Sequence, residues 1–515
     1  MRRSAALLLA LSLVLAPAAA GAQDEGYRTV EEPLYGVTSQ VPEGWQDLGG
    51  GSYARGTPPA DLALIAIQSA PATIDRLWAS LVPQFGLSDV PDVSGAYEGG
   101  TYDWTLHRFE VTAGGVTVAV DLALSENDGT TSLVLLQADP EELDELGDQV
   151  LFPALDAFAP LAPEPTPDAA DFDYSSEEVA FAGGSEDVEL AGTLTLPNTA
   201  GPHPVVITMT GSGPQDRNES LRPLTLLEPF AVIADALTSA GVGVLRYDDR
   251  GVGGSTGDYS AATVQELAED ARAAIDYLET RDDVDPDRIG LFGHSEGGLY
   301  AAILGASDSR VAFIGMMAPA IIDGIDLIVE QNMALTRSAG SPEEQVQAAG
   351  EYTAEVMPLV LEGDLDAARD VSTTFYGSLW DELTPEEQAF AGEREAFIEQ
   401  QLEAQFPTFE SDWYRSLLGY DPGPDWSTVE VPVLAVFGGK DVQVIAESNE
   451  TALREALAVA GNEDVTTLTI PDANHLFQAA VTGAIGEYQE LEPEFIDGFV
   501  ATVVDWFVER AGVAG

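Results

Sequence analysis

Apolar strand-like runs alternate with amphipathic helical patterns between residues 204 and 317, and this alternation restricts the possible folds more than any other feature of the chain. Pro204–Thr210 is almost entirely apolar, as a strand must be when both of its faces are buried. The segments expected after it are a helix at Leu224–Ser239, a strand at Val242–Tyr247, a helix at Ala261–Thr280, and strands at Ile289–Phe292 and Val311–Met317. Strands separated by helices predict a mostly parallel α/β sheet flanked by helices.

A long helical block interrupts this alternation after Met317, and strands resume only at Val431–Phe437 and Thr466–Ile470. Helical patterns inserted after a sheet strand are typical of a cap over an active site, although a plain structural insertion gives the same pattern. We therefore predict an α/β domain over residues 175–515 with a helical cap at about 320–424.

The first 22 residues have the features of a secretory signal peptide. Arg2 and Arg3 precede a short apolar run, and small residues end at Ala22. We predict cleavage after Ala22 and a secreted or periplasmic protein. No later stretch of about 18 uncharged apolar residues follows, so we expect no integral membrane segment.

Residues 27–161 predict a small N-terminal α+β domain, because alternating strand patterns are interrupted by two amphipathic helices. Its Val41-Pro42-Glu43-Gly44-Trp45 segment resembles the start of small domains of the PsbP and Mog1 type. Residues 162–174 are rich in Pro and Ala and lack apolar periodicity, which indicates a linker.

The acidic composition excludes one class of partner. Asp and Glu number 88 against 21 Lys and Arg, giving a formal net charge of −67. Nucleic-acid phosphates would be repelled, so we predict no nucleic-acid partner. The acidity fits either a saline habitat or a solvated surface kept for solubility. The sequence carries no signal for an oligomeric state.

The segment Gly293-His294-Ser295-Glu296-Gly297 joins a predicted strand to an apolar helix. A G-x-S-x-G motif in this context forms a sharp turn that exposes the serine hydroxyl. The helix that follows points its N-terminus at the same place, where it stabilises negative charge. Ser295 is therefore the candidate nucleophile. The chain has no cysteine, so a thiol nucleophile is excluded.

A serine needs a base, and the chain has four histidines: His107, His203, His294 and His475. We expect His475 to be the base, because it follows a predicted strand in the second domain, whereas the turn should direct His294 elsewhere. Asp441, just beyond the strand Val431–Phe437, is the expected orienting carboxylate, and Asp472 is the alternative. The histidines are too scattered for a metal motif, so we predict neither metal nor cofactor.

Two backbone N–H groups should bind the oxyanion of the reaction. One is that of Glu296, and the second should come from Ser212 or Gly213, in the loop after Pro204–Thr210. The neighbouring Gly211 would allow the backbone to approach the substrate. Trp413 and Tyr488 are further candidates for substrate binding.

Six segments together resemble the α/β-hydrolase superfamily, in particular its secreted bacterial, serine aminopeptidase-like branch. They are Gly211–Arg217, Tyr247–Gly251, Gly293–Gly298, Asp412–Arg415, Asp441–Val444 and Asn474–Gln478. The resemblance covers residues 175–510. It implies the α/β-hydrolase fold, a Ser295–His475–Asp441 triad, and carboxylesterase activity on short acyl chains.

The predicted function is a secreted serine hydrolase, with a small-molecule carboxylic ester favoured as its substrate. One alternative is an aminopeptidase or another amide or thioester hydrolase, since an acidic chain could supply carboxylates for a substrate amine. The other is an envelope-binding protein in which the hydrolase scaffold is secondary.

Overall fold

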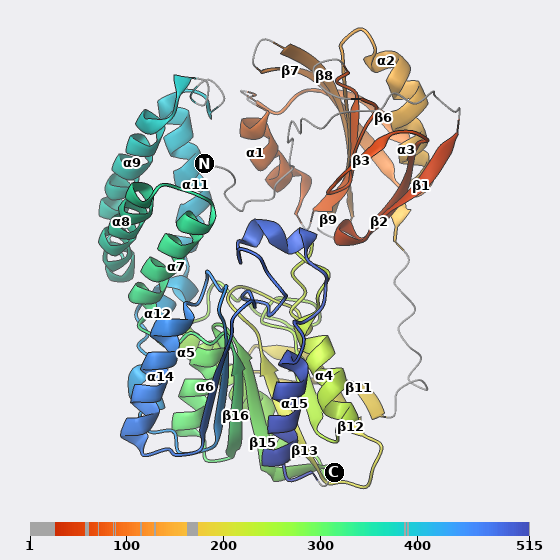
Figure 1. Ribbon diagram of the computed structural model, residues 1–515. Coiled ribbons are helices and arrows are strands. Elements are labelled where there is room, and N and C mark those ends of the chain that lie inside the picture. The colour runs from red at the N-terminus through yellow and green to blue at the C-terminus, as the bar shows by residue number, and fades with distance from the viewer. Residues whose placement is uncertain are drawn as a thin grey trace. The chain divides into compact units, whose positions relative to one another are not determined.

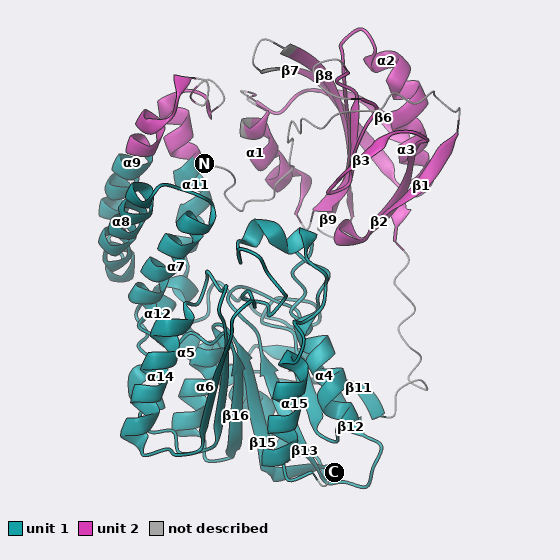
Figure 2. Ribbon diagram, in the orientation of Figure 1, with its two compact units in different colours: residues 1–3, 165–376, 401–515 teal, residues 4–164, 377–400 magenta. Residues whose placement is uncertain are grey.

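The computed structural model describes residues 26–161 and 174–513, apart from 57–60, 71, 86, 88, 114–115, 128–129, 386–387 and 389–390. The chain divides into two units (Figure 2), one comprising residues 1–3, 165–376 and 401–515, the other residues 4–164 and 377–400. The predicted signal peptide and almost all of the predicted linker lie outside the described residues.

An eight-stranded sheet forms the centre of the first unit, in the order β11-β12-β14-β13-β15-β16-β17-β18. β12 is antiparallel to both of its neighbours, and the remaining strands all run in one direction. The strands are β11 (Tyr174–Ala182), β12 (Glu189–Pro197), β13 (His203–Met209), β14 (Gly243–Tyr247), β15 (Val284–His294), β16 (Val311–Met317), β17 (Val433–Gly438) and β18 (Val465–Ile470). The predicted mostly parallel sheet is confirmed.

Helices cover both faces of this sheet (Figure 1). α4 (Pro229–Ser239) and α15 (Phe499–Arg510) lie on one face, and α5 (Val264–Glu279), α6 (Gly297–Ser307) and α14 (Ala446–Ala460) lie on the other. One core of the unit forms where α4 and α15 meet the central strands, and Phe230, Phe292 and Phe507 are fully buried there. Parallel strands with both faces covered are rich in apolar residues, and every residue of β13 and β17 is buried.

The strand order reverses beside β13, because the chain moves from β13 to β14 on one side and then to β15 on the other. In open α/β sheets, ligands bind at the carboxyl ends of the strands where the order reverses. We therefore expect the loops that follow β13 and β15 to form a ligand-binding site.

The helical block is inserted between β16 and β17. It contains α7 (Gly324–Ser338), α8 (Glu343–Glu362), α9 (Leu365–Glu382), α11 (Arg394–Glu410), α12 (Asp412–Leu418) and α13 (Gly423–Trp426). Asp323 caps α7 by accepting the N–H of Ile325 at 3.0 Å. The short α12 packs against α7, α8 and α5.

Two predicted helices begin later than expected. α4 starts at Pro229 rather than Leu224, because the residue before a proline is disfavoured in helical conformation and Glu228 has a non-helical ψ angle of 84°. α5 starts at Val264 rather than Ala261, because Thr263 and Glu266 form a reciprocal capping box at that point.

The other unit contains a seven-stranded antiparallel sheet in the order β3-β4-β5-β9-β8-β7-β6, and a three-stranded sheet in the order β1-β2-β10. The strands are β1 (Tyr27–Glu32), β2 (Val37–Pro42), β3 (Gln46–Gly49), β4 (Ser52–Ala54), β5 (Leu64–Ala70), β6 (Val93–Glu98), β7 (Asp103–Ala113), β8 (Val116–Asn127), β9 (Thr130–Ala138) and β10 (Ala159–Pro160). The predicted additional N-terminal domain with sheets and helices is confirmed.

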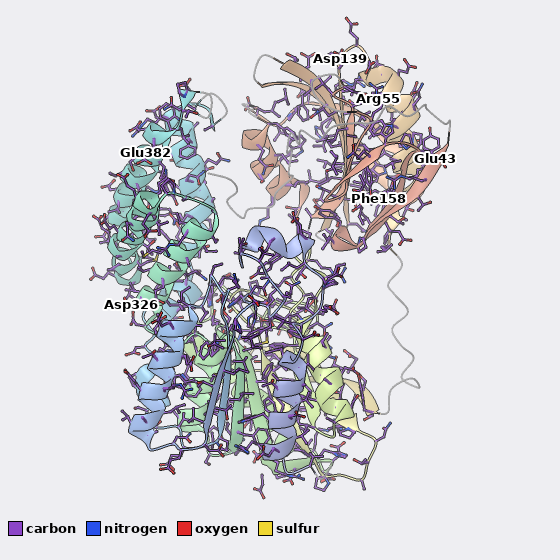
Figure 3. The ribbon with its side chains drawn as sticks, viewed as in Figure 1. Glu43, Arg55, Asp139, Phe158, Asp326 and Glu382 are labelled. Atoms are coloured by element: carbon purple, nitrogen blue, oxygen red, sulfur yellow. The ribbon has the colours of Figure 1, made fainter. Side chains whose placement is uncertain are left out.

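Two cores lie on opposite faces of the seven-stranded sheet. α1 (Ile74–Gln84) packs on one face, and α2 (Leu143–Leu146) and α3 (Phe152–Ala157) pack on the other. Phe158 is fully buried beside Trp104, and Arg55 bonds Asp61 at 2.7 Å. Figure 3 labels Phe158 and Arg55 among the side chains of this unit. Among the described residues, no helix of either unit has both the length and the apolar character needed to cross a bilayer.

Candidate active site

Ser295 lies on the sharp turn between β15 and α6. Its φ angle is +52°, a left-handed conformation that is strained for a serine. A side chain at Gly293 would lie 2.5 Å from the Gly297 oxygen, so the turn requires glycine there. Ser295 is the only residue that is not buried between Ile289 and Ala302. The turn therefore presents this one side chain and hides its neighbours.

Backbone strain gathers in the loops around Ser295. Apart from glycines, four described residues have positive φ angles: Glu219, Ser295, Ala318 and Phe477. They lie in the loops that follow β13, β15, β16 and β18. Strained conformations persist only where the surrounding structure enforces them, and they concentrate at functional sites. These loops therefore form the candidate active site.

The predicted base and its orienting carboxylate are in contact. His475 Nδ1 lies 2.7 Å from Asp441 Oδ2, and both side chains are buried. Asp441 Oδ1 accepts the N–H groups of Gln443 at 2.7 Å and Val444 at 3.0 Å. The carboxylate is thus fixed by three hydrogen bonds. Asp472, the alternative carboxylate, is exposed.

The loop that carries His475 is itself held from several sides. Asn474 Oδ1 accepts the N–H groups of Leu476 and Gln478 at 3.0 and 2.9 Å. Tyr488, which we expected to bind substrate, is only 1% exposed. Its hydroxyl receives hydrogen bonds from the Gln443 side chain and from the backbone of His475. Tyr488 therefore supports the histidine loop, and burial raises the pKa of its hydroxyl.

Two of the three expected oxyanion donors are free. The N–H groups of Ser212 and Glu296 have no hydrogen-bond partner within the described part of the chain. The N–H of Gly213 instead donates to the Tyr259 hydroxyl at 3.2 Å. A side chain at Gly211 would lie 3.3 Å from Ser295 Cβ, so the loop after β13 runs directly beside the nucleophile.

The side chain of Glu296 was not anticipated, because the sequence indicated only its backbone. Its carboxylate is buried and accepts hydrogen bonds from Trp413 Nε1 at 2.9 and 3.1 Å, from the Tyr300 hydroxyl at 2.6 Å, and from Ser212. Burial raises the pKa of this carboxyl, and the hydrogen bonds oppose that shift. The bond from Ser212 links the two residues that carry the free N–H groups.

Trp413 brings the helical block to the site through α12. The centre of its indole ring lies 5.6 Å from the centre of the Tyr259 phenol ring. Its backbone N–H donates to the backbone oxygen of Ser260 at 3.2 Å. Trp413 remains partly exposed. It therefore contacts Glu296, the residue next to Ser295, while part of its surface remains exposed.

His294 is the second feature that sequence reasoning missed. Its Nδ1 lies 2.6 Å from Glu219 Oε1, and its Nε2 lies 3.1 Å from the backbone oxygen of His475. Glu219 also accepts the N–H of Gly211 at 2.9 Å. Only the tertiary structure reveals this pair, because Glu219 is one of 88 carboxylates and lies 75 residues from its partner.

Comparison with known proteins identifies the family of the chain. A family model described as the alpha/beta hydrolase family matches residues 223–481, half of the chain. The esterase EstD of Thermotoga maritima is 26% identical over 287 residues, which are 56% of this chain and 58% of that protein. The putative hydrolase YtaP of Bacillus subtilis is 35% identical over 130 residues, 22% of this chain and 42% of that protein.

The chain thus spans less than two thirds of the length of either relative. Among solved structures, the Pyrococcus furiosus esterase Pf2001 aligns with 68% of this chain and 95% of its own, at 16% identity and a TM-score of 0.40. The match of the family model extends over Ser295, Asp441 and His475, together with the helical block. The chain belongs to the alpha/beta hydrolase family.

Proposed function

We propose that this protein is a serine carboxylesterase that cleaves short-chain acyl esters of small molecules. Ser295 is the nucleophile, His475 is the general base and acid, and Asp441 orients His475. The N–H groups of Ser212 and Glu296 bind the oxyanion. The features of residues 1–22 further support our proposal that the enzyme acts outside the cytoplasm.

The buried contact between Asp441 and His475 is the observation that carries the proposal. Asp441 accepts two backbone N–H groups on one oxygen and faces His475 Nδ1 with the other. A carboxylate acceptor holds the proton on Nδ1, which leaves Nε2 without one. Nε2 is therefore ready to take the proton of an attacking hydroxyl.

The proposed reaction has two steps. The Ser295 oxygen forms a bond to the ester carbonyl carbon while its proton moves to His475 Nε2, and the carbonyl oxygen becomes an oxyanion. The carbon–oxygen bond to the alcohol then breaks, and the alcohol leaves with that proton. Water, deprotonated by His475, attacks the acyl enzyme and releases the carboxylic acid and Ser295.

The surroundings of Glu296 favour an ester over a substrate with a free amine. An aminopeptidase needs a carboxylate with unoccupied oxygens to hold the substrate ammonium. Glu296 adjoins the nucleophile in sequence, and Trp413, Tyr300 and Ser212 already donate to its carboxylate. The carboxylate of Glu219, in the loop after β13, is completely buried and faces His294. The similarity to the esterase EstD supports the same choice.

The test is hydrolysis of p-nitrophenyl esters, from acetate to palmitate, by the purified protein. We expect turnover of the short-chain esters and its loss, by about 10⁴-fold or more, in S295A. A fluorophosphonate probe should label the wild-type protein and leave S295A unlabelled, because the probe reacts only with an activated serine.

Equal rates for wild type and S295A on every ester would contradict the proposal. Thioesters and aminoacyl arylamides run in parallel distinguish the alternatives. Faster cleavage of an arylamide than of any ester would assign the protein to the amide hydrolases. An absence of both turnover and labelling would favour a binding protein.

A further inference from the structure

A buried pair of titratable side chains outside the proposed triad lies between the two loops that the reaction needs. Glu219 is completely buried and His294 is 3% exposed. Glu219 belongs to the loop after β13, which also carries Ser212, and His294 is the last residue of β15. The mechanism proposed above uses neither side chain.

The contacts of His294 fix its protonation. Nδ1 lies 2.6 Å from Glu219 Oε1, and Nε2 lies 3.1 Å from the backbone oxygen of His475. A carboxylate and a carbonyl are both acceptors, so two hydrogen bonds require a proton on each ring nitrogen. His294 is then an imidazolium paired with the Glu219 carboxylate. Burial lowers the pKa of His294, but the charge of Glu219 and these bonds outweigh burial and raise it.

Glu219 extends this connection to the oxyanion loop. Its Oε1 also accepts the N–H of Gly211 at 2.9 Å, the residue before Ser212. Its Oε2 is buried and has no hydrogen-bond partner among the residues described. The carboxylate is therefore compensated only through Oε1, by His294 and Gly211. Its φ angle of +60° shows that the loop holds Glu219 in a strained conformation.

We propose that Glu219 and His294 are positioning residues that lock the oxyanion loop and the histidine loop on either side of Ser295. This inference rests on the proposed function. The chain of contacts runs from the Gly211 N–H through Glu219 and His294 to the backbone of His475. The rings of His294 and His475 lie 4.6 Å apart, so the proposed base packs directly on this pair.

The pair matters for the reaction because small displacements at an active site are costly. A misplacement of about 1 Å can reduce a rate about 100-fold. E219Q keeps the shape of the side chain and an oxygen for Gly211 but removes the charge. His294 then holds one ring proton and can donate to only one of its two partners. H294N breaks the same chain from the other side by removing the donor to His475.

We expect both variants to lower kcat on the best p-nitrophenyl ester about 10- to 100-fold, with KM changed less than about 3-fold. The inhibition constant of a trifluoromethyl ketone, which forms an oxyanion on Ser295, should rise in proportion to the loss in kcat/KM. The kcat of the double variant should be no more than about 3-fold below that of the less active single variant, because the two residues act as one unit.

D308N is the matched control. Asp308 is also a buried carboxylate paired with a cation, but it caps the far end of α6, about 16 Å from its start at the expected rise per residue. D308N should lose stability and keep its kcat. This control distinguishes a positioning role from a general effect of losing a buried ion pair. A general effect would lower kcat in all three variants alike.

Failure of this inference is distinct from failure of the esterase proposal. If wild type cleaves esters and E219Q and H294N retain kcat within 3-fold, the positioning role is overturned. If wild type cleaves no ester, the rate of fluorophosphonate labelling takes the place of kcat, and slower labelling of E219Q and H294N relative to D308N still supports the inference. If neither variant folds while D308N does, the pair is a folding element and the proposal is wrong.

Discussion

At the scale of single residues, the candidate site is determined by which hydrogen-bond partners each polar group can have. Asp441 receives the two backbone donors on one oxygen, so its other oxygen has a fixed direction toward His475. The buried carboxylate of Glu296 accepts hydrogen bonds from the side chains of both Ser212 and Trp413. Both carboxylates are buried and held by several donors, which reduces the reorganisation needed during a reaction.

The role proposed for Asp441 is tested by D441N. The amide has nearly the same shape, but its nitrogen can donate to His475 Nδ1 and stabilise the wrong tautomer. We expect kcat to fall about 10³- to 10⁴-fold with little change in the midpoint of thermal unfolding. D472N is the matched control, because Asp472 precedes the same loop and is exposed. A full loss in D472N with an active D441N would assign the orienting role to Asp472.

At the scale of elements, the two ends of α6 have different functions. Its N-terminus follows Ser295 and carries the free N–H of Glu296. Its C-terminus is capped by Asp308, which bonds Arg310 at 2.6 Å and Arg272 of α5 at 2.9 Å. In the proposed mechanism the first end stabilises the oxyanion, whereas the second connects α6 to α5 on the same face of the sheet.

The stability contributed by Asp308 should depend on pH. Hydrogen bonds from Arg310, supported by the charges of Arg310 and Arg272, lower the pKa of Asp308 from its ordinary value near 3.8 to about 2. A depressed pKa stabilises the folded state above the unfolded-state value, and this stability is lost as the pH falls from about 4 to about 2. D308N lacks that contribution at every pH.

We therefore expect D308N to lower the free energy of unfolding by about 1–2 kcal/mol at pH 7, allowing for solvent at the pair. The difference from wild type should shrink below pH 4. Urea unfolding of both proteins at pH 7, 5, 4 and 3 measures it. A difference that stays constant over this range, or grows as the pH falls, would show that Asp308 contributes through packing rather than charge.

At the scale of the whole molecule, charge is the dominant property. The formal net charge is −67, and Lys440 is the only lysine in the sequence. Most described arginines already lie in ion pairs with Asp or Glu, so the excess of acidic groups repel one another across the surface. Such self-repulsion opposes the compact state, and salt screens it.

We expect the midpoint of thermal unfolding to rise by at least about 3 °C between 0.05 and 1 M NaCl, which corresponds to roughly 2–3 kcal/mol for a chain of this size. Sucrose at equal osmolarity is the control, because it stabilises compact states without screening charge. A rise of the same size in sucrose would remove the electrostatic explanation. A midpoint that falls with salt would show that attractive ion pairs outweigh the repulsion.

The sequence by itself determined the features that depend on local pattern. The alternation of apolar runs and helical patterns is enough to predict a parallel sheet, because a strand buried on both faces must be apolar throughout. The turn around Ser295 was predictable because glycine is required at fixed spacings where a strand bends sharply into a helix. The contact between His475 and Asp441 was also predictable, because both follow predicted strands of the α/β sheet. By contrast, His203 begins its strand and therefore lies at the opposite end of the sheet.

Only the tertiary structure decided which buried charges meet. Glu219 and His294 are 75 residues apart, and Glu296 and Trp413 are 117 residues apart. No local pattern distinguishes these carboxylates from the many that are solvated. Their partners are brought together by strand order and by the docking of α12, and burial then makes each unmatched charge costly enough to demand a partner. The candidate triad could thus be predicted from the sequence. The buried contacts around it, between Glu219 and His294 and between Glu296 and Trp413, depend on the fold.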